Sequence, residues 1–294
     1  MTLRDALILG RVSNLPTVWT NTLVGLALAG GAAGGAVDGA RALPLLLALS
    51  LFYLGGMYLN DAFDAALDAA ERPERPIPSG RVGRGTVFAL GFAMLGSGLA
   101  LLLWIGLGLA GGTGYWPAAS GLALASAILF YDWHHKNNPL SPLVMGLCRV
   151  LVYVTAGVSV AVPLPATLWL AAGALLCYLI GLTTIAKQEN LGRIANRWPL
   201  GLLAAPLAYG AVLIADQPWA ALPWLALVAW MAMALWFLRR RGPGDIPRAV
   251  VSLLAGICLL DSVLIAGAGA PALATLAVLA FPVTVVFQRY VPAT

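Results

Sequence analysis

Four polar residues near the end of an apolar stretch give the sequence its clearest sign of chemistry. Asn60, Asp64 and Asp68 are spaced four residues apart, and Asp61 follows Asn60 directly. On a helix, a step of four residues leaves side chains only about 40° apart, so these three share one face and Asp61 lies on its flank. Carboxylate and amide oxygens are ligands of hard cations, and Mg²⁺ above all combines carboxylates with substrate phosphates. The pattern therefore indicates a magnesium site.

The loop that follows, residues 71–81, alternates cations with rigid prolines. Arg72 and Arg75 lie within it, close to the acidic residues. Arginines beside an acidic cluster are well placed to bind a diphosphate through bidentate contacts. The alternative is an ordinary loop whose arginines only set the membrane topology.

The elements that would carry these residues are membrane-spanning helices. The chain has 294 residues, of which 61% are hydrophobic and only 10% charged, whereas soluble domains carry about 25% charged residues. We expect one transmembrane domain over residues 1–294, all-α, with nine to ten spans around a central cavity and without a cleavable signal peptide. The candidate spans are 12–31, 43–60, 86–108, 116–131, 143–162, 166–186, 199–215, 219–238, 249–268 and 271–288. The last two are the least certain, because only Gly269 and Ala270 separate them.

The charges predict an orientation. With the N-terminus in the cytoplasm, all but Arg41, Arg149 and Arg289 of the 17 Lys and Arg residues fall in the cytoplasmic head and loops. The net charge of +5 is thus explained by topology, and we expect no nucleic-acid partner. We expect an integral protein of the bacterial inner (plasma) membrane with its active site on the cytoplasmic side.

The acidic motif resembles that of a known family. The pattern from Asn60 to Asp68, followed by the contiguous residues Arg75 to Gly80, is similar to the first aspartate-rich motif of the UbiA superfamily of intramembrane prenyltransferases. The resemblance implies a helical bundle that binds a polyprenyl diphosphate through Mg²⁺, ionises it, and transfers the prenyl group to an acceptor. It makes Asn60 and Asp64 metal ligands with Asp61 and Asp68 in support, and it makes Arg72 and Arg75 diphosphate contacts.

The second motif of that family is altered here. The family has paired aspartates four residues apart, where this chain has Glu189 and Arg193, preceded by Lys187. Glu189 keeps a carboxylate for the metal. We expect Lys187 or Arg193 to replace the second cation, because a positive charge there still stabilises a leaving diphosphate. The alternatives are that Asn190 supplies an oxygen, or that the transferase chemistry has been lost.

Four further residues are candidates for the site: Asn21, Tyr131, Lys136 and Arg149. Lys136, near Tyr131, is a candidate diphosphate contact, and Asp132, His134 and His135 are a less favoured zinc alternative. Arg149 lies inside an apolar span, where an arginine is costly unless it is paired or faces a watery cavity. It is a candidate diphosphate or substrate contact, and an internal ion pair is the alternative. Asn21 is a candidate for an acceptor pocket.

Three functions remain in competition. The first is Mg²⁺-dependent prenyl transfer to a small aromatic or lipid-like acceptor. The second is altered chemistry on the same fold, as a terpene cyclase or a non-catalytic biosynthetic partner. The third is a transporter, which is disfavoured because the polar groups gather at one membrane face rather than near the midplane.

Overall fold

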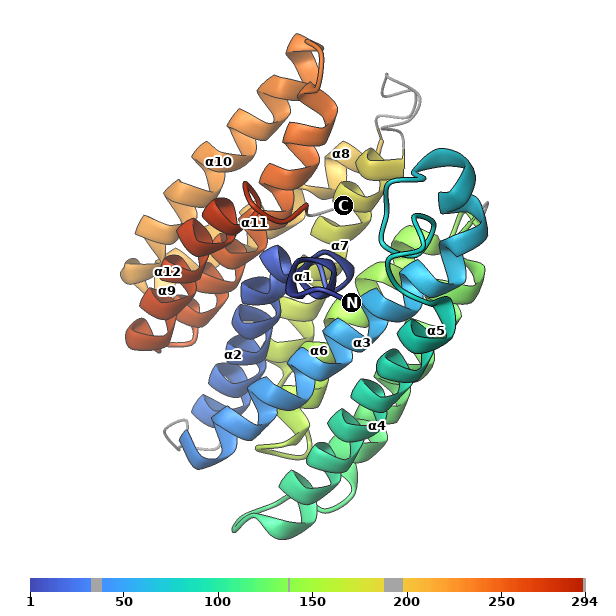
Figure 1. Ribbon diagram of the computed structural model, residues 1–294. Coiled ribbons are helices and arrows are strands. Elements are labelled where there is room, and N and C mark those ends of the chain that lie inside the picture. The colour runs from blue at the N-terminus through green and yellow to red at the C-terminus, as the bar shows by residue number, and fades with distance from the viewer. Residues whose placement is uncertain (33–38, 137, 188–197, 293–294) are drawn as a thin grey trace.

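Ten apolar helices of 13 residues or more, and no strand, make up the part of the chain that the computed structural model describes, residues 1–32, 39–136, 138–187 and 198–292. They lie side by side as an inclined bundle (Figure 1). These helices are α2 (Leu15–Ala32), α3 (Gly39–Glu71), α4 (Arg84–Gly108), α5 (Trp116–His134), α6 (Ser141–Val158), α7 (Ala166–Lys187), α9 (Ala204–Asp216), α10 (Ala221–Arg240), α11 (Asp245–Gly267) and α12 (Pro271–Phe287). Shorter helices are α1 (Leu3–Leu9), η1 (Val12–Asn14), α8 (Pro199–Leu202) and η3 (Pro218–Ala220).

These helices match the predicted spans, and the protein is an integral membrane protein. Six described segments are long and apolar enough to cross a membrane by length and composition alone: α3, α4, α6, α7, α11 and the segment Pro218–Arg240. The uncertain pair near the C-terminus consists of two separate helices, α11 and α12, joined at Gly269. Gly269 has φ of 74°, a left-handed value that suits a residue without a Cβ.

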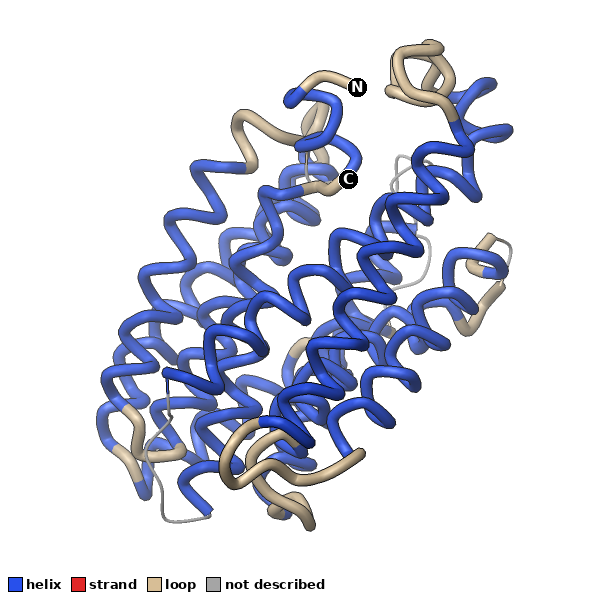
Figure 2. The backbone as a smooth tube through the Cα atoms, turned by 60° about the horizontal axis from the view of Figure 1, so that its bottom comes forward, coloured by secondary structure: helices blue, strands red, loops and turns tan. Residues whose placement is uncertain are grey.

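Both termini lie at the same end of the bundle (Figure 2). The side chain of Gln288, just after α12, donates a hydrogen bond of 3.0 Å to Asn14 Oδ1, just before α2. The chain between the two termini therefore crosses the bundle an even number of times. Of the two predicted counts, ten spans fits this arrangement.

The interior of the described chain is packed in three hydrophobic clusters, and the two larger ones both contribute side chains to the lining of a central cavity. One of these two is built mainly from α6, α7, α10 and α11, and the other from α2, α3, α4, α5 and α6. In the most apolar 18-residue stretch of α11, 83% is buried inside the bundle. The corresponding stretches of α4 and of the segment Pro218–Arg240, which contains α10, are only 28% buried. The helix α11 is thus central, and α4 and α10 present apolar faces outward to lipid.

A short N-terminal helix, α1, was not predicted and lies across the polar end of the bundle. Its Asp5 exchanges hydrogen bonds with Thr2 in a capping box, and Arg81 Nε donates to Asp5 Oδ1 at 2.9 Å. The hydrogen bonds from Thr2, with a further contribution from Arg81, lower the pKa of Asp5 to about 2. The carboxylate therefore stays charged and ties α1 to the loop that follows α3.

The close approach of α2 to α6 depends on Gly25. A Cβ added there would lie 2.5 Å from the Tyr153 carbonyl oxygen and 2.6 Å from Ala156 Cβ. We predict that Gly25→Ala forces the helices apart and costs roughly 1–3 kcal/mol of stability, as overpacking does. Thermal unfolding in detergent measures this. Gly173→Ala on α7 is the matched control, because nothing lies within 4 Å of its added Cβ; an equal loss in both variants would contradict the prediction.

Candidate active site

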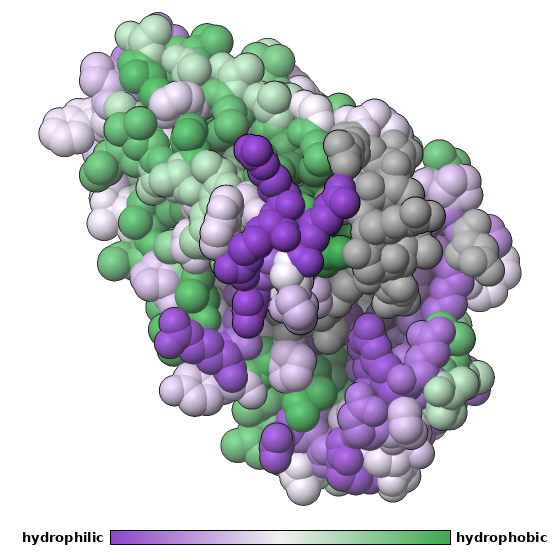
Figure 3. Space-filling model, turned by 90° about the horizontal axis from the view of Figure 1, so that it is seen from above, coloured by the Kyte–Doolittle hydropathy of each residue, from purple (hydrophilic) through white to green (hydrophobic). Residues whose placement is uncertain are grey.

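A cavity of about 670 Å³ lies between α2, α3, α5, α6, α7 and α11. Its lining changes character along α3, from Leu49 and Phe52 at the apolar end to Asp64, Asp68 and Arg72 at the polar end. From Leu49 to Asp68, α3 rises roughly 28 Å at 1.5 Å per residue. The cavity thus joins a charged mouth to a long apolar interior. Figure 3 looks onto this end of the bundle, where clusters of hydrophilic residues gather.

The acidic residues of α3 are arranged as their spacing predicted. The helix runs without a break to Glu71, and Asn60, Asp64 and Asp68 all line the cavity. Asp61 is buried on the flank of this face and is not among the lining residues. One face of a helix therefore presents two carboxylates and an amide oxygen to a single space.

Three cations from different segments neutralise these acids. Arg75 Nη1 lies 2.8 Å from Asp68 Oδ2 and 3.5 Å from Asp61 Oδ1. Lys136 Nζ, which follows α5, lies 2.6 Å from Asp64 Oδ1. The third cation is Arg11, whose Nη2 lies 2.8 Å from Asp61 Oδ1. Opposite charges at such distances relieve the cost of desolvating carboxylates at a membrane boundary.

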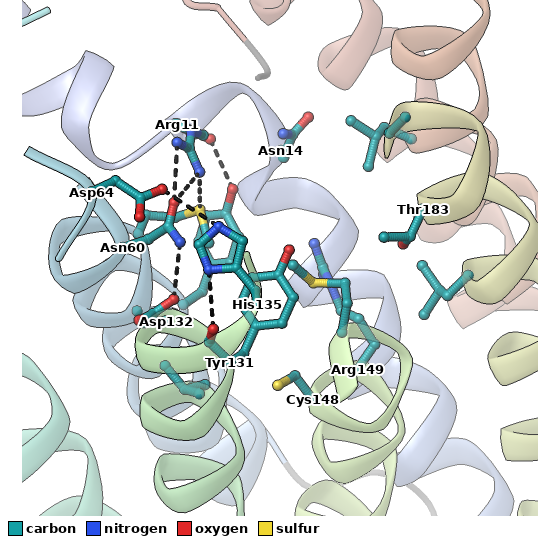
Figure 4. A pocket seen from close by; sticks show the side chains of 18 of the residues that line it. Arg11, Asn14, Asn60, Asp64, Tyr131, Asp132, His135, Cys148, Arg149 and Thr183 are labelled. Carbon is teal, nitrogen blue, oxygen red and sulfur yellow. Dashed lines mark hydrogen bonds and ion pairs between the residues drawn. The ribbon is translucent and has the colours of Figure 1, made fainter. Parts of the chain in front are cut away.

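The part played by Arg11 was missed in the sequence. Its guanidinium contacts Asp61 and also lies 3.4 Å from Asn60 Oδ1. Figure 4 shows Arg11 beside Asn60. The backbone of Arg11 has φ of 40°, unusual for a residue with a side chain, and Tyr53 Oη donates to its carbonyl oxygen at 3.1 Å. An arginine just before the first span is explained equally well by membrane topology, so no sequence signal singles out Arg11 as part of the site.

Asp132, at the end of α5, was also undervalued. Asn60 Nδ2 donates to its Oδ1 at 3.1 Å, while its Oδ2 is buried and without a hydrogen-bond partner. The zinc alternative does not fit, because His134 is exposed and His135 lies 3.5 Å from Asp64 instead. Among the described residues, no group of three His, Cys, Asp or Glu side chains is gathered to hold a metal ion.

The donor set nevertheless fits a hard cation. The atoms with which Asn60, Asp64, Asp68 and Asp132 could bind a metal are all oxygens, which suits Mg²⁺. The unpartnered Oδ2 of Asp132 is a buried acceptor that a cation would satisfy. Asp64 and Asp68 would have to exchange Lys136 and Arg75 for the metal.

Arg72, Tyr131, Lys187 and Arg149 also line this cavity. Lys187 Nζ donates to the Asn138 carbonyl oxygen and to Ser141 Oγ, at 2.8 and 2.7 Å, rather than to the acids. The candidate residues of the second motif, Glu189 and Arg193 together with Asn190, lie outside the described residues.

Asn21 needs a correction. It was expected to line an acceptor pocket, but it is fully buried and absent from the cavity lining. Its amide joins Arg149 to Asp261 instead. A polar residue on an apolar helix can face a ligand or a polar partner, and its spacing alone does not distinguish them.

Comparison with known proteins identifies the family. The profile of the UbiA prenyltransferase family matches residues 18–254. The chain belongs to the UbiA prenyltransferase family. Curated relatives include the digeranylgeranylglyceryl phosphate synthase of Methanopyrus kandleri, 37% identical over 161 residues, or 53% of each chain. Another is the protein of that name from Ignicoccus hospitalis, 38% identical over 44% of this chain and 37% of the relative. The matches thus span about half the length of these relatives or less.

Solved structures share the UbiA fold over almost the whole chain. One comes from a study of "the biosynthesis of Digeranylgeranylglyceryl phosphate synthase in membranes", with a TM-score of 0.64 and 17% identity, covering 90% of this chain and 98% of that one. The other is the apo structure of a UbiA homologue from Aeropyrum pernix K1, with a TM-score of 0.61 and 17% identity, covering 88% and 98%. At this identity the likeness establishes the fold.

The two arginines of the loop after α3 are predicted to behave differently. Arg75 neutralises two buried carboxylates, whereas no ion pair is recorded for Arg72 within the described chain. Arg75→Gln should lower stability by roughly 2 kcal/mol, since it leaves charged acceptors unpaired. Arg72→Gln should leave stability unchanged and weaken the binding of magnesium pyrophosphate. Thermal unfolding and calorimetric titration measure the two effects, and equal unfolding temperatures for the two variants would contradict the assignment.

Proposed function

We propose that this UbiA family member transfers a prenyl group from a polyprenyl diphosphate to a small aromatic or lipid-like acceptor within the membrane. The proposal rests on the observation that one cavity has both a charged mouth and an apolar interior. A prenyl diphosphate has the same two halves, a polyanionic head and a hydrocarbon tail. The cavity matches both within the length of α3.

The head would be bound at the mouth. Arg72, Arg75, Lys136 and Lys187 all contribute to this part of the cavity lining. Guanidinium groups bind phosphate oxygens through paired N–H donors, and lysines add point charges. The tail would lie against apolar residues such as Leu49, Phe52, Leu124, Leu179 and Ile257.

The reaction would proceed by ionisation. The bond between carbon 1 and the diphosphate oxygen breaks, and its electrons leave with the diphosphate. The cations of the mouth stabilise the charge that develops on the leaving group, which lowers the barrier. The acceptor's nucleophilic atom then bonds to carbon 1 and loses its proton. The apolar walls exclude water, which would otherwise capture the allylic cation.

We propose Mg²⁺ as the cofactor. Asn60, Asp64, Asp68 and Asp132 would hold it, Asp61 would support them from the flank, and Glu189 is the remaining candidate ligand by sequence. When bound, Mg²⁺ neutralises diphosphate oxygens and so assists C–O cleavage. Support comes from the oxygen-only donor set and the unpartnered Asp132 oxygen.

The relatives suggest the class of donor. Their names refer to digeranylgeranylglyceryl phosphate, a lipid with two geranylgeranyl chains. We propose a long-chain donor of this kind, such as geranylgeranyl diphosphate, for which the depth of the cavity along α3 leaves room.

The proposal is tested by turnover. Purified protein with Mg²⁺ and geranylgeranyl diphosphate should release pyrophosphate in the presence of an acceptor, and EDTA should stop the release. Asp64→Asn should reduce the rate about 100-fold or more, the scale of removing one preorganised electrostatic group. Glu74→Gln is the matched control, because Glu74 is exposed and does not line the cavity.

Other outcomes would select the competing functions. Pyrophosphate release with a cyclic hydrocarbon as product, and without an acceptor, would indicate a cyclase. Tight binding of the diphosphate without turnover would indicate a non-catalytic partner. Failure of any prenyl diphosphate to bind would end the proposal.

We also propose that the mouth faces the cytoplasm of a plasma membrane. Arg11, Arg72, Arg75 and Lys136 gather at the charged mouth, and both termini lie at that end of the bundle (Figure 2). Positive loops stay in the cytoplasm. A green fluorescent protein fused to Thr294 should therefore fluoresce, while an alkaline phosphatase fusion there should be inactive. The reverse result would contradict the orientation. Fusions in the loop between α4 and α5 serve as the opposite-side control.

A further inference from the structure

Arg149 is the one arginine that the sequence places inside an apolar span, away from the charged mouth. It lies in the middle of α6 and lines the cavity with Cys148 and Val152. Figure 4 shows its side chain in the same pocket as Arg11, Asn60 and Asp64. An arginine inside a membrane-spanning helix costs free energy, so its position indicates a functional role.

The guanidinium is held in place but not neutralised by direct contact. Its Nη1 donates to Asn21 Oδ1 at 3.1 Å, and its Cζ lies 5.4 Å from the centroid of the Tyr53 ring. No carboxylate of the described residues lies within 4 Å of it, and no other hydrogen bond from it is recorded there. A guanidinium has five N–H donors, so most remain available to the cavity.

A buried polar cluster sets the direction of this side chain. Asp261 is fully buried on α11 and accepts hydrogen bonds from Thr20 at 2.5 Å, from Asn21 at 2.8 Å and from Tyr153. Three neutral donors thus satisfy the carboxylate. Because the Asn21 amide donates to Asp261, its oxygen is turned toward Arg149. The cluster thus holds Arg149 through the hydrogen bond from its Nη1 to Asn21, while the rest of the guanidinium is available to the cavity.

We infer that Arg149 binds an anionic group of the acceptor, so that the acceptor is a carboxylate or phosphate compound. This inference rests on the proposed function. The matching chemistry is a planar fork of donors on a half-buried guanidinium, which pairs with carboxylate and phosphate oxygens. Asn21 and Asp261 are positioning residues, since they act through Arg149.

The location of Arg149 assigns it to the acceptor rather than to the donor. It stacks on Tyr53, which precedes Asn60 by seven residues, about 10 Å along the helix. The mouth beside Asn60 already contains Arg72, Arg75, Lys136 and Lys187 for the diphosphate. A second anion site two turns deeper suits a substrate that reaches past carbon 1 of the donor.

Binding measurements test this without turnover. Protein in nanodiscs of neutral phosphatidylcholine is titrated with two matched pairs of compounds. One pair is 4-hydroxybenzoate and its methyl ester, and the other is 1-O-hexadecylglycerol 3-phosphate and 1-O-hexadecylglycerol. The anionic member of one pair should bind about tenfold or more tightly than its neutral match, the effect of one hydrogen bond between charged groups. The pair that responds identifies carboxylate or phosphate as the natural anion.

Variants connect the preference to Arg149. Arg149→Gln should abolish it, Arg149→Lys should keep part of it, and Asp261→Asn should reduce it. All three should bind geranylgeranyl thiodiphosphate with Mg²⁺ within about threefold of the wild type, which also shows that they are folded. Arg41→Gln is the matched control, because Arg41 donates to the carbonyl oxygens of Ser159 and Ala110 and does not line the cavity.

Two results would overturn the inference while leaving prenyl transfer intact. One is equal binding of charged and neutral members in both pairs, and the other is an anion preference that persists in Arg149→Gln. A loss of thiodiphosphate binding confined to Arg149→Gln would instead assign Arg149 to the donor. Failure of the wild type to bind the thiodiphosphate would defeat the proposed function itself.

Discussion

The need to neutralise carboxylates at a membrane boundary organises the polar end of this protein. Asp61, Asp64 and Asp68 on α3 are balanced by Arg11, Arg75 and Lys136. These cations come from the N-terminal segment, the loop after α3 and the segment after α5, so charge balance alone draws three separate parts of the chain together. Removal of any of these cations would deprive a carboxylate of an ion pair, and unpaired charges are costly at this depth.

The same balance bears on substrate binding. Asp61, Asp64 and Asp68 are each paired with a protein cation, whereas one oxygen of Asp132 has no partner. A magnesium diphosphate brings both charges at once, since the metal suits the acids and the diphosphate suits the arginines and lysines. The proposed site would therefore exchange partners on binding rather than create new charge. An exchange of this kind would let the proposed site hold a metal although, among the described residues, no three acidic, His or Cys side chains are gathered around one point.

The sequence predicted the elements and the acid face, and it failed where contacts are long-range. Helix periodicity alone placed Asn60, Asp64 and Asp68 on one face of a helix, and in the structure that face of α3 lines the cavity. Arg11 reaches its acids across about 50 positions of the chain, and the partner of Asn21 is 240 positions away. Charge counting assigns such an arginine to topology, and nothing local reveals its partner. Asp132 was hidden by its neighbouring histidines, which suggested a different metal.

The last helix, α12, provides partners and cover for the polar side chains buried inside the bundle. The family match ends at residue 254, within α11, so α12 lies wholly beyond it. The polar groups of α11 find partners there: Ser262 Oγ donates to the Ala274 carbonyl oxygen at 2.9 Å, and Cys258 lies 3.6 Å from Thr284 Oγ1. Because α12 packs on both α2 and α11, it keeps the helices that carry Asn21 and Asp261 away from lipid on that side. A buried carboxylate needs such cover, since hydrocarbon offers it no hydrogen bonds. The tenth helix thus protects the cluster that orients Arg149, although none of its own residues lines the cavity.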